Sequence, residues 1–510
     1  MSNGKLYTPV KLLGLLGGLL LFIFISFLDI NPGNKQTTYM LGVAVLMAIW
    51  WMTEAVPIAI TALLPIVFYP LFGIMDGKTA SSTYFNHIIF LFIGGFVVAL
   101  AMEKWNLHRR IALKILLWIG VSPNKILIGF MVATAFLSMW ISNTATAMMM
   151  VPIVVSVLAH LEEKLGSDYV KKYSIALLLG VAYSASIGGI ATLIGTPPNI
   201  AFSQIFAQTF PQAPEIGFAQ WILFGLPLSV VMLFFAWLVL YLLFVPKQKV
   251  EAETREALME EYNKLGKISY EEIVVLISFI ILALLWLFRS GFDISMGKMN
   301  LHMPGWAKLF KHPKYFNDGT AAILVALVLF IIPSRDKSQA IMDCQSLARL
   351  PWNIVLLFGG GFALAKGFEV SGLSVWIAHR FEALSGLNIV LLVGIISLVV
   401  VILTEFTSNT ATTQMVLPVL ASIAIGIHIN PLILMLPATI AASLAFMLPV
   451  ATPPNIIIFG TGRVTIPQML KAGIILDIIG VFVLLAVMFL LVMPLLGINV
   501  HDFPVWAIVK

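Results

Sequence analysis

The chain has 510 residues, of which 60% are hydrophobic and 11% are charged, and its mean hydropathy is +1.01. Ordinary globular domains carry about 25% charged residues, so this composition predicts a protein of the bilayer rather than of water. The net charge of +6 is modest, and no nucleic-acid binding is expected from it. The single cysteine, Cys344, excludes an internal disulfide and a cysteine-based metal site.

The first predicted element is an apolar span at residues 10–30. Similar runs recur at 218–245, 272–288 and 473–496, each close to the roughly 20 residues that a helix needs to cross the hydrocarbon core. Because these runs continue to the end of the chain, a secretory signal followed by a soluble domain is excluded. The pattern predicts an all-α polytopic membrane protein.

The chain contains an internal repeat. Residues 136–146 and 402–412 both carry Ser-Asn-Thr-Ala-Thr, at an offset of 266 (402 − 136). The same offset relates the Gly-Gly-Phe motifs that begin at Gly94 and Gly360. Separated matches at one offset are the mark of a duplicated unit.

A second motif, Thr-Pro-Pro-Asn, begins at Thr196 and again at Thr452, at an offset of 256 (452 − 196). Proline cannot donate to the helical hydrogen-bond ladder, and it pushes the preceding residue out of the helical region, so we expect each apolar segment to break here. In lipid, a break is tolerated only where it is buried in protein or lines a wet cavity. Paired breaks in corresponding positions of two repeats predict a transport site near the midplane of the membrane.

These motifs divide the chain into a leading span and two halves. The basic residues that flank the first span, Lys5 and Lys11, those of residues 109–114 and those of the linker are all expected in the cytoplasm, which places the N-terminus there. The predicted division is an N-terminal span at 1–37, a first repeat at 38–245 with a hairpin at 123–162 and a broken helix at 172–210, a linker at 246–269, and a second repeat at 270–510 with a hairpin at 387–428 and a broken helix at 430–470.

The two Ser-Asn-Thr motifs are candidate substrate sites. We name Ser142, Asn143 and Thr144 the first tip, and Ser408, Asn409 and Thr410 the second tip. The apolar flanks of each tip could form two full spans or one re-entrant hairpin, and the hairpin is favoured because it would bring free N–H groups, an amide and hydroxyls to bilayer depth. Such groups bind anions at helix N-termini. Since no lysine or arginine lies within four residues of either tip, a carboxylate would be held by neutral donors.

A hydroxyl stands four residues before each tip serine, at Ser138 and at Thr404. On a helix this spacing places the two side chains on one face. Hydroxyl and carbonyl oxygens suit an alkali cation, although a hydroxyl can also bond back to its own helix. The matched pair favours a sodium site. Among other ionisable groups, Glu405 adjoins Thr404 but points to a different side of the helix, and Glu54 and Lys366 are expected near span ends.

The tips and the two Thr-Pro-Pro-Asn motifs resemble the paired signatures of the divalent anion/sodium symporter family. The resemblance implies about 11 transmembrane helices plus two re-entrant hairpins in an inverted repeat, and a homodimer in the cell membrane that works as an elevator-type transporter. It also implies that the substrate is a dicarboxylate and that Na⁺ is the coupling ion. By motif position, the substrate would contact both tips together with Thr452 and Pro453. One sodium ion would bind at Ser138, Ser142, Asn143 and Gly195, and a second at Thr404, Thr407, Asn409 and Ala451.

The resemblance therefore implies import of C4 dicarboxylates such as succinate, fumarate and malate, with at least two sodium ions. A channel would need rings of charge or of carbonyls, and none is seen in the sequence. An intramembrane enzyme would need a nucleophile with a base, or metal ligands, at bilayer depth, and the tips offer serine without a nearby histidine. A sodium-independent dicarboxylate exchanger of the same fold remains the alternative. The sequence leaves open the sodium stoichiometry and the acceptance of citrate.

Overall fold

The computed structural model describes residues 8–120, 122–165, 167–245, 252–296, 299–335, 337–500 and 502–508. Within these ranges the chain is helical apart from a two-stranded hairpin and one isolated bridge. Nine of the described helical segments are long and apolar enough to cross a membrane, and four shorter apolar helices accompany them. Together they form the polytopic helical protein that the composition predicts.

The first half of the chain supplies twelve helices. They are α1 (Pro9–Phe27), α2 (Lys35–Thr53), α3 (Ile58–Thr61), α4 (Leu64–Leu71), α5 (Gly77–Ser82), α6 (His87–Lys104), α7 (Leu107–Ile119), α8 (Pro123–Ser138), α9 (Asn143–Leu165), α10 (Ser167–Ile190), α11 (Pro197–Thr209) and α12 (Phe218–Phe244).

The linker and the second half follow. Their elements are α13 (Ala252–Lys264), α14 (Tyr270–Leu287), β1 (Gly291–Met296), β2 (Met299–Pro304), α15 (Asp318–Ile331), α16 (Cys344–Ala348), α17 (Trp352–Val370), α18 (Leu373–Phe381), α19 (Ile389–Phe406), α20 (Asn409–Gly426), α21 (Leu432–Ala441), α22 (Pro453–Phe459), α23 (Ile466–Val487) and α24 (Met493–Leu495). Single turns of other helix types lie at Trp306–Leu309, Pro313–Tyr315, Glu382–Gly386, Pro449–Ala451, Met488–Val492 and Val505–Ala507.

The two halves place equivalent helices in equivalent surroundings. In α6, a side chain added at Gly94 would come within 2.6 Å of the Ala322 backbone in α15, whereas in α17 one added at Gly360 would come within 2.6 Å of the Ala62 backbone, next to α3. Each glycine therefore permits a close approach between a long helix and a neighbour. The neighbours are themselves related, by an offset of 260 (322 − 62), so the repeat extends to tertiary packing.

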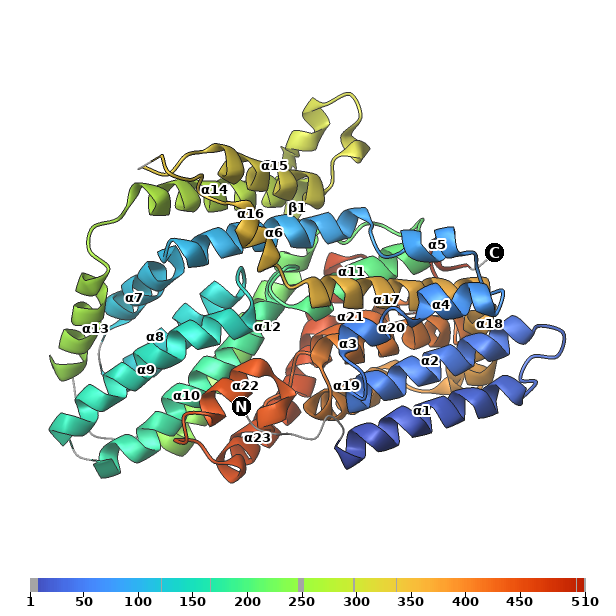
Figure 1. The fold of residues 1–510 in the computed structure, drawn as a ribbon, viewed down its shortest axis with the longest axis horizontal. Coiled ribbons are helices and arrows are strands. Elements are labelled where there is room, and N and C mark those ends of the chain that lie inside the picture. Colours follow the sequence, from blue (N-terminus) through green and yellow to red (C-terminus); the bar gives the residue numbers. More distant parts are fainter. Residues whose placement is uncertain are drawn as a thin grey trace.

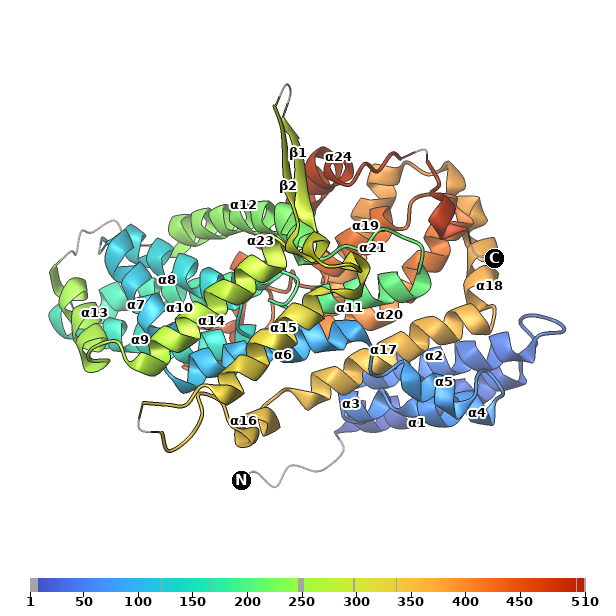
Figure 2. The same cartoon turned by 90° about the horizontal axis from the view of Figure 1, so that it is seen from above.

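The helices form two groups joined across the centre of the molecule (Figure 1). Helices α8, α9 and α10 pack together at one end, and α18, α19 and α20 lie toward the other. The unbroken helices α12 and α23 contact each other between these groups. The β1–β2 hairpin, in antiparallel register with Gly291 opposite Pro304, projects from the helical body (Figure 2).

Part of the charged linker is docked on the helices. Residues 246–251 lie outside the described residues, but α13 packs against α7 and α9. Arg109 reaches Glu261 of α13 at 2.5 Å, and Arg110 reaches Glu272 of α14 at 2.7 Å. Both members of the Arg110–Glu272 pair are buried, and Arg110 also donates to the linker carbonyls of Leu265 and Gly266, which fixes the end of the linker to the start of α7.

Candidate functional site

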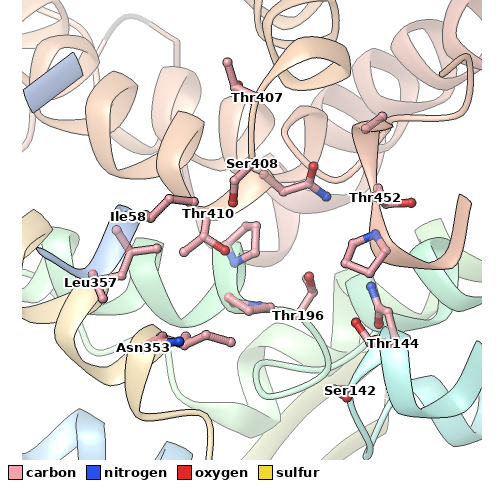
Figure 3. A pocket seen from close by; sticks show the side chains of 18 of the residues that line it. Ile58, Ser142, Thr144, Thr196, Asn353, Leu357, Thr407, Ser408, Thr410 and Thr452 are labelled. Atoms are coloured by element: carbon pink, nitrogen blue, oxygen red, sulfur yellow. The ribbon is translucent and has the colours of Figure 1, made fainter. Parts of the chain in front are cut away.

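Both tips, and the threonine and prolines of both Thr-Pro-Pro-Asn motifs, line one cavity of about 760 Å³. Figure 3 shows Ser142 and Thr144 on one side of it, Ser408 and Thr410 on another, Thr196 between these two pairs and Thr452 above Thr144. The end of α2, α3 and the start of α17 complete the wall, with Ile58, Asn353 and Leu357 facing the tips. Segments some 270 residues apart in the sequence therefore meet here, as the repeat predicts.

Proline and asparagine build the two broken segments in the same way. Pro197 opens α11 and Pro453 opens α22, at the first helical position where a missing N–H is harmless. The asparagine two residues later donates its amide into the preceding loop: Asn199 Nδ2 lies 2.8 Å from Thr192 O, and Asn455 Nδ2 lies 2.9 Å from Leu448 O. These bonds satisfy carbonyl groups that the break leaves without helical partners.

Behind the first tip, the side-chain amide of Asn143 meets three oxygens, and we name this group the first oxygen cluster: Ser138 Oγ, Ala185 O, Gly195 O and the Asn143 amide. With its nitrogen turned toward them, the amide donates to Ser138 Oγ at 2.6 Å, to Ala185 O at 3.1 Å and to Gly195 O at 3.3 Å. Ser138 Oγ in turn donates to Ala185 O at 2.6 Å. If the amide turned its oxygen inward instead, the hydroxyl, amide and carbonyl oxygens would be a suitable set of ligands for a hard cation in the place of the amide protons.

The second oxygen cluster, Thr404 Oγ1, Asn409 Oδ1 and Ala442 O, repeats this geometry behind the second tip. Thr404 Oγ1 lies 2.7 Å from Asn409 Oδ1 and 2.8 Å from Ala442 O. Ser138 and Thr404 are both fully buried. In each half, a hydroxyl thus meets the tip asparagine and a carbonyl of the broken segment, so the residues present fit an alkali cation in both places.

The cavity has few charges for a site that would hold an anion. Glu54, at the left-handed C-cap of α2 with φ +46°, is the one ionisable residue among the described residues that line it. The N-termini of α9, α11 and α20 all open onto the cavity. Helices α9 and α20 offer free N–H groups and their dipoles, whereas α11, which begins with two prolines that lack an N–H, contributes its dipole. These groups supply positive potential in place of lysine or arginine.

The loops that carry the broken segments are held differently in the two halves. In the first half, Thr192 Oγ1 donates to Met139 O at 2.5 Å and accepts from Gly195 N at 3.0 Å. In the second half, the carboxylate of Glu405 takes the place of the Thr192 hydroxyl in holding the loop. Its two carboxylate oxygens accept from Met447 N at 2.8 Å and from Leu448 N at 2.9 Å.

The structure brings most of the predicted site residues together. Both tips line the cavity, as do Gly195, Thr407, Ala451, Thr452 and Pro453. Ser138 and Thr404 lie behind the tips in the oxygen clusters. The Thr407 hydroxyl is turned away, donating to Leu403 O at 2.9 Å and lying 2.5 Å from Thr412 Oγ1. Sequence reasoning missed the carbonyls of Ala185 and Ala442, which carry no side-chain signal, and the wall residues Ile58, Asn353 and Leu357.

Known proteins share the sequence or the fold of this chain. Residues 10–498 match the family described as the sodium:sulfate symporter transmembrane region. The chain is 40% identical to the sodium-dependent dicarboxylate transporter SdcS of Staphylococcus saprophyticus, covering 98% of this chain and 95% of that protein. It is 41% identical to SdcS of Staphylococcus aureus strain COL, over 98% and 94% of the two chains. Among solved structures, MtrF of Neisseria gonorrhoeae, described within a class of antimetabolite efflux pumps, shares the fold at a TM-score of 0.54 and 13% identity, covering 89% of this chain and 94% of that one.

Proposed function

Since the chain belongs to the family of the sodium:sulfate symporter transmembrane region, we propose that it is a secondary active transporter that imports C4 dicarboxylates such as succinate, fumarate and malate with at least two sodium ions. The observation that carries this proposal is the pair of tips, each backed by an oxygen cluster, around one cavity. The relatives named as sodium-dependent dicarboxylate transporters support the choice of ion and substrate.

In this proposal the dicarboxylate lies between the two tips. Asn143 and Asn409 would offer amide groups, and Ser142, Thr144, Ser408 and Thr410 would offer hydroxyl groups to the two carboxylates. Thr452 and Pro453 would contact the substrate from the second broken segment. Helix N-termini stabilise the negative charge, and because every donor is neutral, the site can also release its anion.

One sodium ion would bind in each half. The first would be held by Ser138, Ser142, Asn143 and Gly195, and the second by Thr404, Thr407, Asn409 and Ala451. The oxygen clusters support this placement and add the carbonyls of Ala185 and Ala442 to the candidate ligands. Because Asn143 and Asn409 belong both to a tip and to a cluster, a bound cation would orient the amide that meets the substrate, which couples the two binding events.

An elevator-type exchange between two states is supported by a second, smaller cavity of about 290 Å³. It is lined by His87, Ile88 and Leu91 at the start of α6, which are equivalent to Asn353, Ile354 and Leu357 in the wall of the main cavity at the offset of 266 (353 − 87). It is also lined by residues 317–319, which are equivalent to the wall residues 57–59 at the offset of 260.

The wall that faces the tips in this structure thus has a counterpart in the other half. In our proposal the hairpins and broken helices move as one body from the first wall to the second, carrying substrate and sodium. An inverted repeat would point the two walls toward opposite sides of the membrane.

We further propose a homodimer in the cell membrane, with the N-terminus and the linker in the cytoplasm. The basic residues Arg109 and Lys114 of α7 lie on the same side as the docked helix α13, in agreement with an excess of positive charge in cytoplasmic loops. Cross-linking of the purified protein in detergent would report the oligomeric state.

Uptake of radiolabelled succinate into proteoliposomes tests the function. We expect an inward sodium gradient to drive accumulation above the external concentration, with no need for internal dicarboxylate. Choline or potassium in place of sodium should abolish this accumulation. Equal uptake in choline whenever succinate is present inside would instead identify a sodium-independent exchanger.

A further inference from the structure

A buried pair of carboxyl groups lies beneath the second broken segment, outside both oxygen clusters. Glu405 of α19 is fully buried, and Asp477 of α23 is 4% exposed. The two carboxyl groups interact with each other, and the hydroxyl group of Tyr183 in α10 interacts electrostatically with both of them. Two acidic groups therefore share one site in the interior of the helix bundle.

Glu405 and Asp477 differ in their hydrogen-bond partners. Each oxygen of Glu405 accepts a backbone N–H, the environment that suits an anion. Asp477 has the Glu405 carboxyl and the Phe446 backbone as polar neighbours, but neither of its buried oxygens accepts a hydrogen bond of normal geometry from the described residues. No lysine, arginine or histidine in the described part of the chain forms an ion pair with either carboxylate. Because two buried charges side by side are costly, the pair must be neutralised in part, by a proton shared between the carboxyls or by a cation.

The first half has no such pair. Gly225 in α12 and Gly473 in α23 each lie against the loop of their own half, so that a side chain added at either would meet loop backbone within 2.9 Å. Their offset of 248 (473 − 225) makes Ser229 the equivalent of Asp477, and Ser229 simply donates to Ile187 O at 2.7 Å. Met139 is the equivalent of Glu405 at the offset of 266 (405 − 139). Both acids are thus special to the second half.

We propose that Glu405 and Asp477 form a third sodium site, which rests on the transport function proposed above and fixes its stoichiometry at three. The unpartnered oxygens of Asp477 are the primary ligands, and Glu405 joins the ion to the loop that carries Ala442 and Thr452. A sodium ion here would neutralise one charge of the pair and hold α23 against that loop. Binding at this site would therefore order the second half of the substrate cavity.

The proposal has an electrical consequence. Two sodium ions only neutralise a dicarboxylate, whereas three carry one net positive charge inward. A potential of 100 mV, negative inside, then raises the accumulation ratio about 50-fold, which corresponds to about 2.3 kcal/mol for one charge.

Paired measurements of ²²Na⁺ and succinate uptake in proteoliposomes test the site, with a potassium gradient and valinomycin to set the potential. The unmodified protein should take up three sodium ions per succinate and respond to valinomycin. Asp477→Asn, and Asp477→Ser, which installs the residue of the first half, should take up two and lose the response. Asp29→Asn, at an exposed acid between α1 and α2, is the matched control and should behave as the unmodified protein.

A ratio of two in the unmodified protein, or uptake that ignores the potential, overturns the third site while leaving sodium-coupled transport intact. A response to the potential with two sodium ions and acidification of the lumen would show that a proton takes this place, and also overturns the assignment. If sodium drives no uptake at all, the proposed function itself fails. The measurements on the unmodified protein decide the matter even if neither variant folds.

Discussion

Thr404 and Asn409 meet side by side behind the second tip, with the threonine hydroxyl 2.7 Å from the amide oxygen. Behind the first tip, the Ser138 hydroxyl lies 2.6 Å from the side-chain amide of Asn143. Each pair joins the end of one hairpin arm to the first residue of the next, and each also reaches a carbonyl of a broken segment. In each half, a hydroxyl therefore lies where the two hairpin arms meet the broken segment, and these are the elements that a bound cation would hold together.

Removing either hydroxyl should weaken sodium binding more than succinate binding. We expect Ser138→Ala and Thr404→Ala each to raise the sodium concentration for half-maximal uptake about tenfold, the loss of one ligand worth roughly 1.4 kcal/mol. The KM for succinate at saturating sodium should change by less than threefold. Thr404→Ser, which keeps the oxygen, is the control, and a change confined to the succinate KM would contradict the assignment.

The asparagines of the tips should be more sensitive, because each is shared between an oxygen cluster and the cavity. Asn143→Ala or Asn409→Ala should reduce succinate uptake by at least 100-fold, since each removes an amide from the substrate and an oxygen from the cation. Size-exclusion chromatography should show a folded protein. Asn388→Ala, which only removes the N-cap of the exposed start of α19, serves as the comparison. Normal uptake by both tip variants would refute the site.

Thr192 should position the first broken segment although it does not touch the substrate. Its hydroxyl links Met139 O to Gly195 N, and valine in its place would leave Met139 O without this donor and Gly195 N with only the longer bond to the carbonyl of residue 192, at 3.3 Å. The cost of about 1–3 kcal/mol should fall on the geometry of the cavity and raise the succinate KM by roughly 5- to 100-fold. Thr192→Ser should restore it. Equal kinetics for valine and serine would show that the tie is dispensable.

The sequence was sufficient for the parts of the site that the repeat marks. The tips, the Pro-Pro breaks and the two hydroxyls were visible because each occurs twice at a fixed offset. The family resemblance that they carry is confirmed by the match over residues 10–498. The carbonyls of Ala185 and Ala442 were invisible, since any residue can supply a backbone oxygen. Asn353 gave no signal because the repeat pairs it with His87 rather than with another asparagine.

The pair formed by Glu405 and Asp477 could not be predicted from the sequence. Glu405 stood out in the sequence as an acid in an apolar run, but its partner in α23 is 72 residues away (477 − 405) and has serine as its repeat equivalent. Only the packing of α19 against α23 brings the two together. The docking of the linker was not predicted from the sequence either: Arg109 pairs with Glu261 of α13, and Arg110 donates to the linker carbonyls of Leu265 and Gly266.

The two walls provide the last prediction, which concerns the change of state. In a Cys344→Ser background, we expect a cysteine at Ile354, in the main cavity, and one at Ile88, in the smaller cavity, to react with a membrane-impermeant maleimide from opposite sides of the membrane. Comparison of intact cells with inverted vesicles would assign the sides.

Succinate with sodium should protect both cysteines, because the substrate faces each wall in one of the two states. Succinate in choline should protect neither, since the amides of the tips would lack the cations that orient them. A cysteine at exposed Trp118, on α7 and away from both cavities, should react equally in all conditions. Labelling of Ile88→Cys and Ile354→Cys from the same side would contradict the inverted arrangement, and protection of Ile354→Cys alone would show that the tips never reach the second wall.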